Sequence, residues 1–182
     1  MSTESIFERL NDPAQKREAF HDLVVSHQQK LYWHIRKIVL NHDDAHDLLQ
    51  NVFMKAWSSL DRFRGESSLS TWLYRIATNE SLTFLNQQKR KRGFVGDADE
   101  AYLSNRLKSD SFFDGNEIQR RLMEAVVKLP EKQRLVFNMK YFDNLKYEQM
   151  AEILNLTTGA LKASYHHAVK KIEESLRNDP VF

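Results

Sequence analysis

Apolar residues recur at helical spacing along almost the whole chain, and no segment keeps the alternating pattern of a β-strand for long. The clearest stripe runs over about four turns between positions 44 and 60. Its apolar members are Ala45, Leu48, Leu49, Val52, Phe53, Ala56, Trp57 and Leu60. This periodicity predicts an all-α fold.

Helix start signals divide the first half of the chain. Asp12-Pro13 matches an N-cap followed by proline at the first helical position, so a helix is expected from there toward Val39. Asp43 or Asp44 is expected to cap the next helix. A third helix is expected to have its cap at Ser70-Thr71 and to bury Leu69, Leu73, Ile76 and Ala77.

The second half shows the same spacing, divided by proline and asparagine. Pro130 is expected to end one helix and open another. Asn155 suits the left-handed backbone of a tight turn between two short helices near 146–154 and 158–175, and Thr157 or Thr158 is expected to cap the second. The helix before Pro130 is expected to be lined by Ile118, Leu122, Val126 and Leu129.

An acidic, glycine-containing segment separates these two halves. Three of the 5 glycines fall between positions 93 and 115, together with five acidic residues and only two basic ones. That composition disfavours a packed element and predicts a flexible acidic linker at 93–115. We therefore expect two small helical bundles, at 1–92 and 116–182. Four aromatic residues inside the linker indicate that it docks on a domain or on a partner: Phe94, Tyr102, Phe112 and Phe113.

Composition narrows the functions that such a fold could serve. The chain has no cysteine, which excludes disulfides, thiolate zinc sites and thiol nucleophiles and fits a reducing cytoplasm. No apolar run approaches membrane-spanning length, so no membrane insertion is expected. No phosphate-binding glycine loop is present, and no enzyme activity or cofactor is expected. His42 and His46 have metal-like spacing but lack a third ligand, so capping and surface hydrogen bonds are favoured over a metal site.

The stretch from 61 to 92 combines a polar loop, aromatic residues and positive charge. The loop contains Gly65, which permits a backbone turn that other residues resist, and it leads into a helix with Trp72 near its start. This order suits the reading of single-stranded or opened nucleic acid. The alternative is that Trp72 belongs to the core and that the basic run at 89–92 is a solvated helix end. The candidate residues are Arg64, Gly65, Glu66, Ser67, Ser68, Trp72, Arg75, Asn79, Lys89, Arg90, Lys91 and Arg92.

The last two predicted helices have helix-turn-helix spacing. Positions 155–171 contain no acidic residue, as suits a surface that meets duplex DNA. A plain α-hairpin inside a bundle is the alternative. The candidate DNA-binding residues are Thr157, Thr158, Gly159, Lys162, Ser164, His166, His167 and Lys170.

Three segments of the chain carry a family pattern. They read DDAHDLLQNVFMKAW, FRGESSLSTWLYRIATN and LPEKQRLVFNMKYFDNLKYEQMAEILNLTTGALK. In this order they resemble bacterial sigma factors of the extracytoplasmic-function (ECF) class, over 12–92 and 116–176. The resemblance implies that the helix at 44–60 docks on core RNA polymerase. Without the resemblance, the polar face of this helix would suit a solvated surface. The residues implied in docking are Asp44, Asp47, Gln50, Asn51 and Phe53.

The same resemblance implies the roles of the two nucleic-acid surfaces. The loop at 64–68 and the helix after it would read the opened minus-ten element, and the helix-turn-helix would read the duplex minus-thirty-five element. Implied partners are core RNA polymerase, promoter DNA and an anti-sigma factor. Family members commonly carry arginines in the second half of the recognition helix, where this chain reads ASYHH at 163–167, so guanine reading by arginine is not expected there.

Two other functions fit parts of this pattern. One is an ordinary helix-turn-helix regulator that acts without polymerase, but the sequence offers no dimerisation helix for paired half-sites. The other is an adaptor that uses the same helices only for protein contacts. The ECF resemblance favours a sigma factor that binds core polymerase, selects promoters and helps to melt them.

Overall fold

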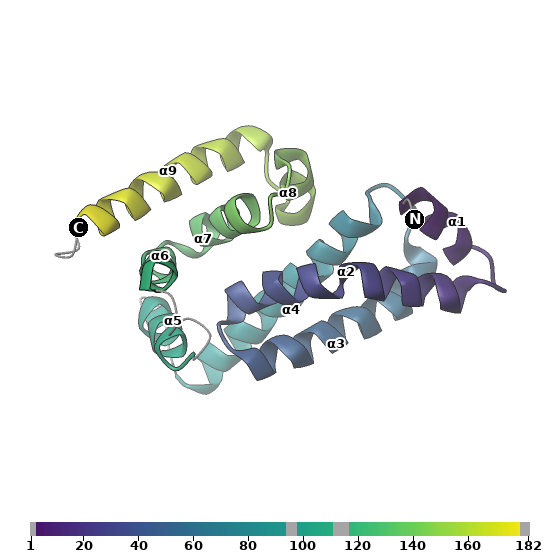
Figure 1. The fold of residues 1–182 in the computed structure, drawn as a ribbon, viewed down its shortest axis with the longest axis horizontal. Coiled ribbons are helices and arrows are strands. Elements are labelled where there is room, and N and C mark those ends of the chain that lie inside the picture. Colours follow the sequence, from purple (N-terminus) through teal and green to yellow (C-terminus); the bar gives the residue numbers. More distant parts are fainter. Residues whose placement is uncertain (1–2, 94–97, 111–116, 179–182) are drawn as a thin grey trace.

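The computed structural model describes residues 3–93, 98–110 and 117–178, and every regular element in these ranges is helical (Figure 1). The predicted all-α class is confirmed. In chain order the elements are α1 (Thr3–Leu10), α2 (Lys16–Val39), α3 (His42–Ser59), the short turn η1 (Leu60–Arg62), α4 (Leu69–Lys91), α5 (Ala98–Lys108), α6 (Glu117–Val127), α7 (Glu131–Phe137), the π-helical turn η3 (Asn138–Phe142), α8 (Tyr147–Leu154) and α9 (Thr158–Arg177).

The N-terminal bundle is built from α2, α3 and α4, which pack against one another, with α1 lying across α2. The apolar stripe of α3 faces this core, as its spacing predicted. Its buried members are Ala45, Leu48, Val52 and Ala56. They meet Leu23, Leu31 and Ile35 of α2 and Leu69, Leu73 and Ala77 of α4 in one apolar cluster.

The start of α2 differs from the sequence expectation. The Asp12 carboxylate accepts from the N–H of Ala14 at 2.9 Å, and the Asp12 carbonyl accepts from the N–H of Lys16. These bonds place Asp12-Pro13 in the turn between α1 and α2. The expected helix start at Pro13 is therefore wrong, because aspartate and proline here form a turn rather than a cap.

The caps of α3 and α4 lie earlier than expected. The Asn41 side chain accepts from the N–H of Asp44 at 2.9 Å, so neither Asp43 nor Asp44 is the cap. The Ser68 hydroxyl accepts from the N–H of Thr71 at 3.1 Å, and α4 begins directly after it. Each side chain satisfies a backbone donor that the first helical turn leaves unpaired.

The C-terminal bundle is built from α6, α7, α8 and α9. Pro130 stands between α6 and α7, as predicted. Val126, Phe137 and Ala168 lie in the core of the bundle. Ile118 was expected to line the inner face of α6, but its side chain is 73% exposed, so that expectation is wrong.

The α8–α9 pair has the predicted helix-turn-helix geometry. Asn155 ends α8 with a φ of 54°, which is the left-handed conformation expected of it. The Thr157 hydroxyl accepts from the N–H of Ala160 at 3.1 Å and caps α9. Leu161 is buried at the first turn of α9 and holds the helix against the bundle.

The segment between the bundles contains a packed helix. α5 lies against α6, and its Arg106 forms an ion pair with Asp44 of α3. The expectation of a linker without a packed element is therefore wrong for 98–108. Burial of apolar side chains stabilises this helix despite the acidic composition of the segment. The buried side chains are those of Tyr102, Leu103 and Leu107. The other linker aromatics, Phe94, Phe112 and Phe113, lie outside the described residues.

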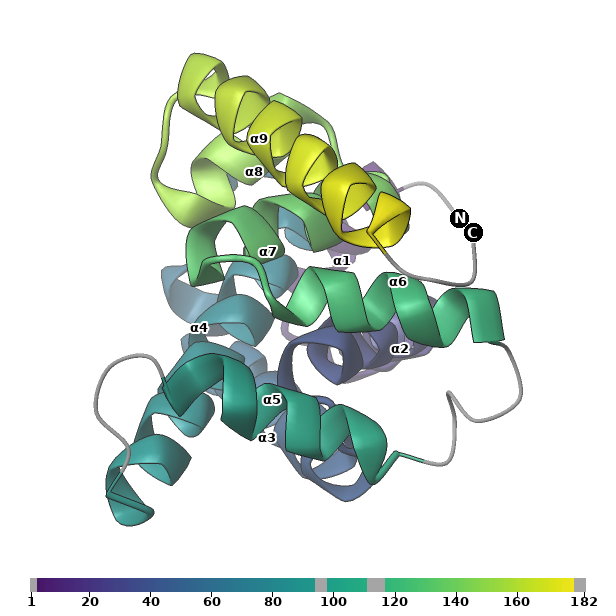
Figure 2. The same cartoon turned by 90° about the vertical axis from the view of Figure 1, so that its left-hand side faces the viewer.

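The two bundles pack directly against each other. α4 lies against α8, and α2 contacts η3. Figure 2 shows α6 to α9 stacked on the helices of the N-terminal bundle. One apolar cluster includes Leu31 and Leu73 from the first bundle and Met139 and Met150 from the second. The chain therefore has a closed arrangement, which the sequence did not predict.

Candidate nucleic-acid interface

A hollow of about 350 Å³ lies beside the loop between η1 and α4. It brings together five of the residues that the sequence selected: Arg64, Glu66, Ser67, Trp72 and Arg75. It adds Arg62 and Phe63, which the sequence reasoning missed. The alternation of arginine and phenylalanine in DRFRG is the signal that could have found them.

Aromatic rings form the apolar part of this hollow. The Phe63 and Trp72 rings are tilted against each other with centroids 4.8 Å apart. The Phe7 ring of α1 meets Phe63 edge-on, with centroids 5.6 Å apart. Trp72 is half-buried, so the ring is shared between the core and the hollow.

Gly65 sets the shape of the loop. Its φ is +73°, a conformation that favours glycine, and a Cβ there would lie 3.1 Å from Cζ of Phe7. The loop backbone is therefore seated on α1. Since α1 is anchored by the buried Ile6 and Leu10 and by the Arg9–Asp22 ion pair at 2.7 Å, it supports the loop from below.

Positive charge surrounds the hollow. Arg62, Arg64 and Arg75 face a single carboxylate, that of Glu66. Nε of Arg75 is buried and makes no hydrogen bond within the described part of the chain. A buried donor without an acceptor costs free energy, which a phosphate oxygen or a base edge would offset. The hollow therefore favours an anionic ligand with flat rings.

Other residues predicted for this surface do not line the hollow. The Ser68 hydroxyl is engaged in capping α4, so its contact with a base stays a prediction. Asn79 is exposed farther along α4. Arg90 lies about 27 Å along the helix from Trp72, so the basic run forms a separate patch.

The basic run at the end of α4 divides into two parts. Arg90 and Lys91 are exposed. Lys89 pairs with Glu131 of α7 at 3.8 Å, and the Arg92 guanidinium lies 5.2 Å from the centre of the Tyr102 ring. Two of the four cations thus contact neighbouring helices in the closed arrangement.

The outer face of α3 presents both polar and apolar side chains. Asp47, Gln50 and Asn51 are exposed, whereas Asp44 is partly covered by Arg106. Phe53 is half-buried and lines a groove of about 610 Å³ between α2 and α3. The apolar lining of this groove is Phe20, Val24, Leu49, Phe53, Met54 and Trp57.

This groove is an apolar surface in contact with solvent. Met54 is 70% exposed and Trp57 is 39% exposed, although the stripe on α3 placed Trp57 among the inward residues. The Trp57 ring meets Phe20 edge-on with centroids 4.9 Å apart. An exposed apolar groove with a polar rim is typical of a protein-binding surface.

The histidines on α3 are held by a tyrosine. The hydroxyl of Tyr32 is 2.8 Å from Nδ1 of His42, and the His42 and His46 rings meet edge-on. Surface hydrogen bonding was the expected role of this pair.

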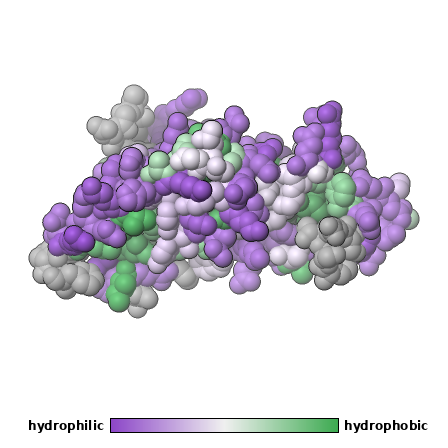
Figure 3. Space-filling view, turned by 90° about the horizontal axis from the view of Figure 1, so that it is seen from above, coloured by the Kyte–Doolittle hydropathy of each residue, from purple (hydrophilic) through white to green (hydrophobic). Residues whose placement is uncertain are grey.

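The candidate recognition helix α9 keeps its selected residues on the surface. Lys162, His166, His167 and Lys170 are exposed, while Leu161, Ala168 and Ile172 on the opposite face are buried. Thr157 and Gly159 are also exposed, and Thr158 and Ser164 are half-buried. The view from the α9 side shows a mostly hydrophilic surface (Figure 3). This arrangement suits contact with duplex DNA.

Two family models match the chain: Sigma-70 region 2 over residues 23–91 and Sigma-70 region 4 over 119–172. The ECF RNA polymerase sigma factor SigW of Bacillus subtilis is 30% identical over 172 residues, spanning 89% of this chain and 91% of SigW. The chain belongs to the ECF sigma factors. The ECF RNA polymerase sigma-E factor of Escherichia coli K12 is 30% identical over 186 residues, spanning 97% of this chain and 95% of that protein.

A solved structure shows the same fold. The sigma factor RpoE of Bartonella quintana, in a co-crystal with the anti-sigma factor NepR, superposes with a TM-score of 0.67 at 22% identity. The match covers 88% of this sigma factor and 98% of that chain.

Both candidate nucleic-acid surfaces of this ECF sigma factor overlap the matched regions. The loop at 64–68 and all of α4 lie in the region 2 match, and α8 and most of α9 lie in the region 4 match. Helices α1 and α5 lie outside both matches. Among the described residues, no helix combines the length and apolarity that a membrane span requires.

Proposed function

We propose that this ECF sigma factor reads the opened minus-ten element at the hollow beside α4 and the duplex minus-thirty-five element with α9. Sigma factors direct RNA polymerase to initiate transcription at specific promoters. The observation that carries the residue assignment is the buried Nε of Arg75, which has no hydrogen-bond partner among the described residues and lies beside the Phe63–Trp72 rings. Flat rings stack on an unpaired base, and guanidinium groups bind its backbone.

The proposed division of the chain follows the sequence. Residues 1–92 form the domain that binds polymerase and the minus-ten element, 93–115 form the linker, and 116–182 form the domain that binds the minus-thirty-five element. The packed α5 supports a linker with one structured part.

Core polymerase is proposed to dock on the outer face of α3. The polar rim of Asp47, Gln50 and Asn51 would fix orientation, and the groove around Phe53 would supply apolar contact area. Catalysis would then belong to the polymerase, and we propose no enzyme activity for this chain. We place the protein in the cytoplasm, where polymerase works. The co-crystal of the Bartonella protein supports an anti-sigma factor as a further partner.

The overall proposal is tested by reconstitution. Purified protein is added to core RNA polymerase with a library of genomic fragments, and the transcripts are sequenced. We expect start sites that share two upstream elements. If no fragment yields a transcript that depends on the protein, the proposed function is wrong.

Replacing Phe7 with alanine is expected to weaken minus-ten recognition. Phe7 contacts both Gly65 and Phe63, so its loss removes the support of the loop without touching the hollow's charged residues. We expect the holoenzyme to bind single-stranded minus-ten DNA about threefold to tenfold more weakly, on the scale of one aromatic pair at roughly 0.5–1.5 kcal/mol. Fluorescence anisotropy measures this.

A matched variant distinguishes the loss of loop support from a general loss of stability. Phe7→Leu keeps apolar bulk against the core cluster but lacks the ring edge that meets Phe63. It should restore thermal stability and only part of the DNA affinity. Equal DNA affinity for the wild type and Phe7→Ala would show that α1 does not position the loop.

Replacing Lys162 with alanine is expected to weaken minus-thirty-five binding at every sequence tested. Lys162 is exposed on α9, where its ammonium would neutralise one phosphate. The slope of log K against log salt should fall by about 1. Lys128 is an exposed lysine of the same domain outside α9, so Lys128→Ala is the control and should leave the slope unchanged. If both variants lower the slope equally, the effect comes from the net charge of the domain and not from contact between Lys162 and a phosphate.

A further inference from the structure

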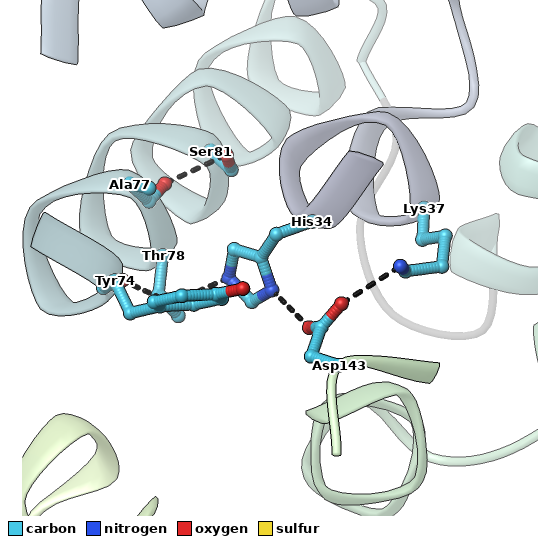
Figure 4. A network of polar contacts seen from close by, with 7 residues as sticks. All are labelled: His34, Lys37, Tyr74, Ala77, Thr78, Ser81 and Asp143. Carbon is cyan, nitrogen blue, oxygen red and sulfur yellow. Dashed lines mark hydrogen bonds and ion pairs between the residues drawn. The ribbon is translucent and has the colours of Figure 1, made fainter. Parts of the chain in front are cut away.

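A buried carboxylate joins the two bundles. Asp143 follows η3 in the C-terminal bundle, but its side chain points to α2 of the N-terminal bundle (Figure 4). Oδ2 of Asp143 is 2.6 Å from Nδ1 of His34, and Oδ1 accepts from Nζ of Lys37 at 2.8 Å. The side chains of His34 and Asp143 are 0% and 3% exposed.

The contact continues into α4. Nε2 of His34 is 2.9 Å from Oγ1 of Thr78, and Thr78 donates to the carbonyl of Tyr74 at 2.7 Å. The Tyr74 ring meets the His34 ring edge-on, with centroids 4.9 Å apart. The Thr78 side chain is buried, although threonine is a polar residue. His34 therefore connects Asp143 to α4, the helix that is proposed to read the minus-ten element.

Asp143 is ionised in this setting. Burial raises the pKa of its carboxyl, but the charges and hydrogen bonds of His34 and Lys37 outweigh burial and leave the pKa below its usual value. Burial and the Asp143 charge raise the pKa of Tyr74, so its phenol stays neutral. An ionised carboxylate in a buried site needs its hydrogen-bonding and cationic partners. Separation of the bundles would remove them together.

The backbone around Asp143 directs it away from its own bundle. The N–H of Asp143 donates to the carbonyl of Asn138, which closes the π-helical turn, and Asn144 has a φ of 52°. Such turns are rare and are frequent at functional sites. Among the described residues, the Asp143 carboxylate pairs with His34 and Lys37, which both belong to the N-terminal bundle.

The closed arrangement is too small to span a promoter. A compact chain of this length has a radius of gyration of about 16 Å. The minus-ten and minus-thirty-five elements lie about 25 base pairs apart, which is about 85 Å of duplex at 3.4 Å per pair. The two reading surfaces can meet both elements only after the bundles separate.

We propose that Asp143, His34 and Lys37 form an interdomain latch that holds the free sigma factor closed. The latch is autoinhibitory, because the chain must open before it can read both elements. This inference rests on the proposed reading of two promoter elements. When only a fraction of the molecules is open, the apparent affinity for a ligand of the open form falls by that fraction. A sigma factor that reads both elements on the polymerase is bound there in its open form, so breaking the latch should strengthen binding to core polymerase.

The test begins with the shape of the free protein. Small-angle scattering should give about 16 Å for the wild type. Asp143→Lys replaces the carboxylate between His34 and Lys37 with a cation that repels Lys37, and it should raise the radius of gyration. Glu173→Lys makes the same charge change at an exposed position of α9 and should leave it unchanged. Asp143→Lys combined with Lys37→Asp should restore part of the closed population.

The second measurement is the apparent affinity for core polymerase. Asp143→Lys is expected to bind about tenfold more tightly than the wild type, and Glu173→Lys equally tightly. Helix content by circular dichroism checks that both bundles stay folded. If Asp143→Lys unfolds, Asp143→Asn, which keeps the size of the side chain, replaces it with the same expectations.

Three results would overturn the latch. They are an extended wild type in solution, a folded Asp143 variant that stays compact, and a variant that opens without tighter polymerase binding. Scattering needs no polymerase, so failure of the latch is distinguishable from failure of the proposed function. The latter would appear as absence of promoter-dependent transcripts with the wild type.

Discussion

Replacing Trp72 with alanine is expected to lower the affinity of the holoenzyme for minus-ten single-stranded DNA by about 10-fold to 100-fold. The half-buried ring packs on Phe63 and borders the hollow. Stacking of one base on an aromatic side chain contributes roughly 1–3 kcal/mol. Permanganate reactivity of promoter thymines should show the same loss as a reduced yield of open complex.

Trp72→Phe provides the matched comparison. It keeps a flat ring at the same position, so it should retain most of the stacking and most of the open complex. Both variants need a melting curve, because part of the ring lies in the core. Core polymerase affinity should be the same for all three proteins. If Trp72→Ala opens promoters as well as the wild type does, the hollow does not receive a base.

Replacing Met54 with aspartate is expected to weaken core polymerase binding by about 30-fold or more. Met54 is 70% exposed in the apolar groove beside Phe53 and Trp57, so the change hardly affects folding. A carboxylate buried without a partner at the centre of an interface costs at least about 2 kcal/mol. Titration of labelled protein with core enzyme measures the effect.

Ile118→Asp is the control for this variant. Ile118 is 73% exposed on α6 of the other bundle, so the same chemical change is made at the same exposure. It should leave polymerase affinity unchanged. If both variants bind as the wild type does, polymerase does not use the groove. If both lose affinity equally, the effect comes from added negative charge.

Local sequence patterns predicted most of the helices. The α3 stripe is confirmed because the 3.6-residue period directly reports which face is buried. The turn at Asn155 and a cap at Thr157 or Thr158 were predicted because both features depend on local side chains and backbone, and Thr157 is the cap. The starts of α2 and α3 were misplaced because several neighbouring polar residues could serve as caps, and only the backbone path decides among them.

The candidate site was predicted in part. Polar and aromatic residues close together in the chain, such as Glu66 and Trp72, were found from the sequence. Phe7 was missed, because it lies far from the loop in sequence and reaches Gly65 only through the packing of α1 on α2. The roles of Arg64 to Ser68, of α3 and of α9 stay predictions until the experiments above are done.

The sequence by itself determined the all-α class, the helix-turn-helix and the family, because these depend on periodicity, on turn chemistry and on motifs within single segments. The tertiary structure decided which polar side chains are buried and form contacts between the two bundles. Thr78 and Asp143 are polar, yet the side chain of each is buried where the bundles meet. Their partners lie far away in the chain, and burial depends on what packs against a residue in space, which no local pattern specifies.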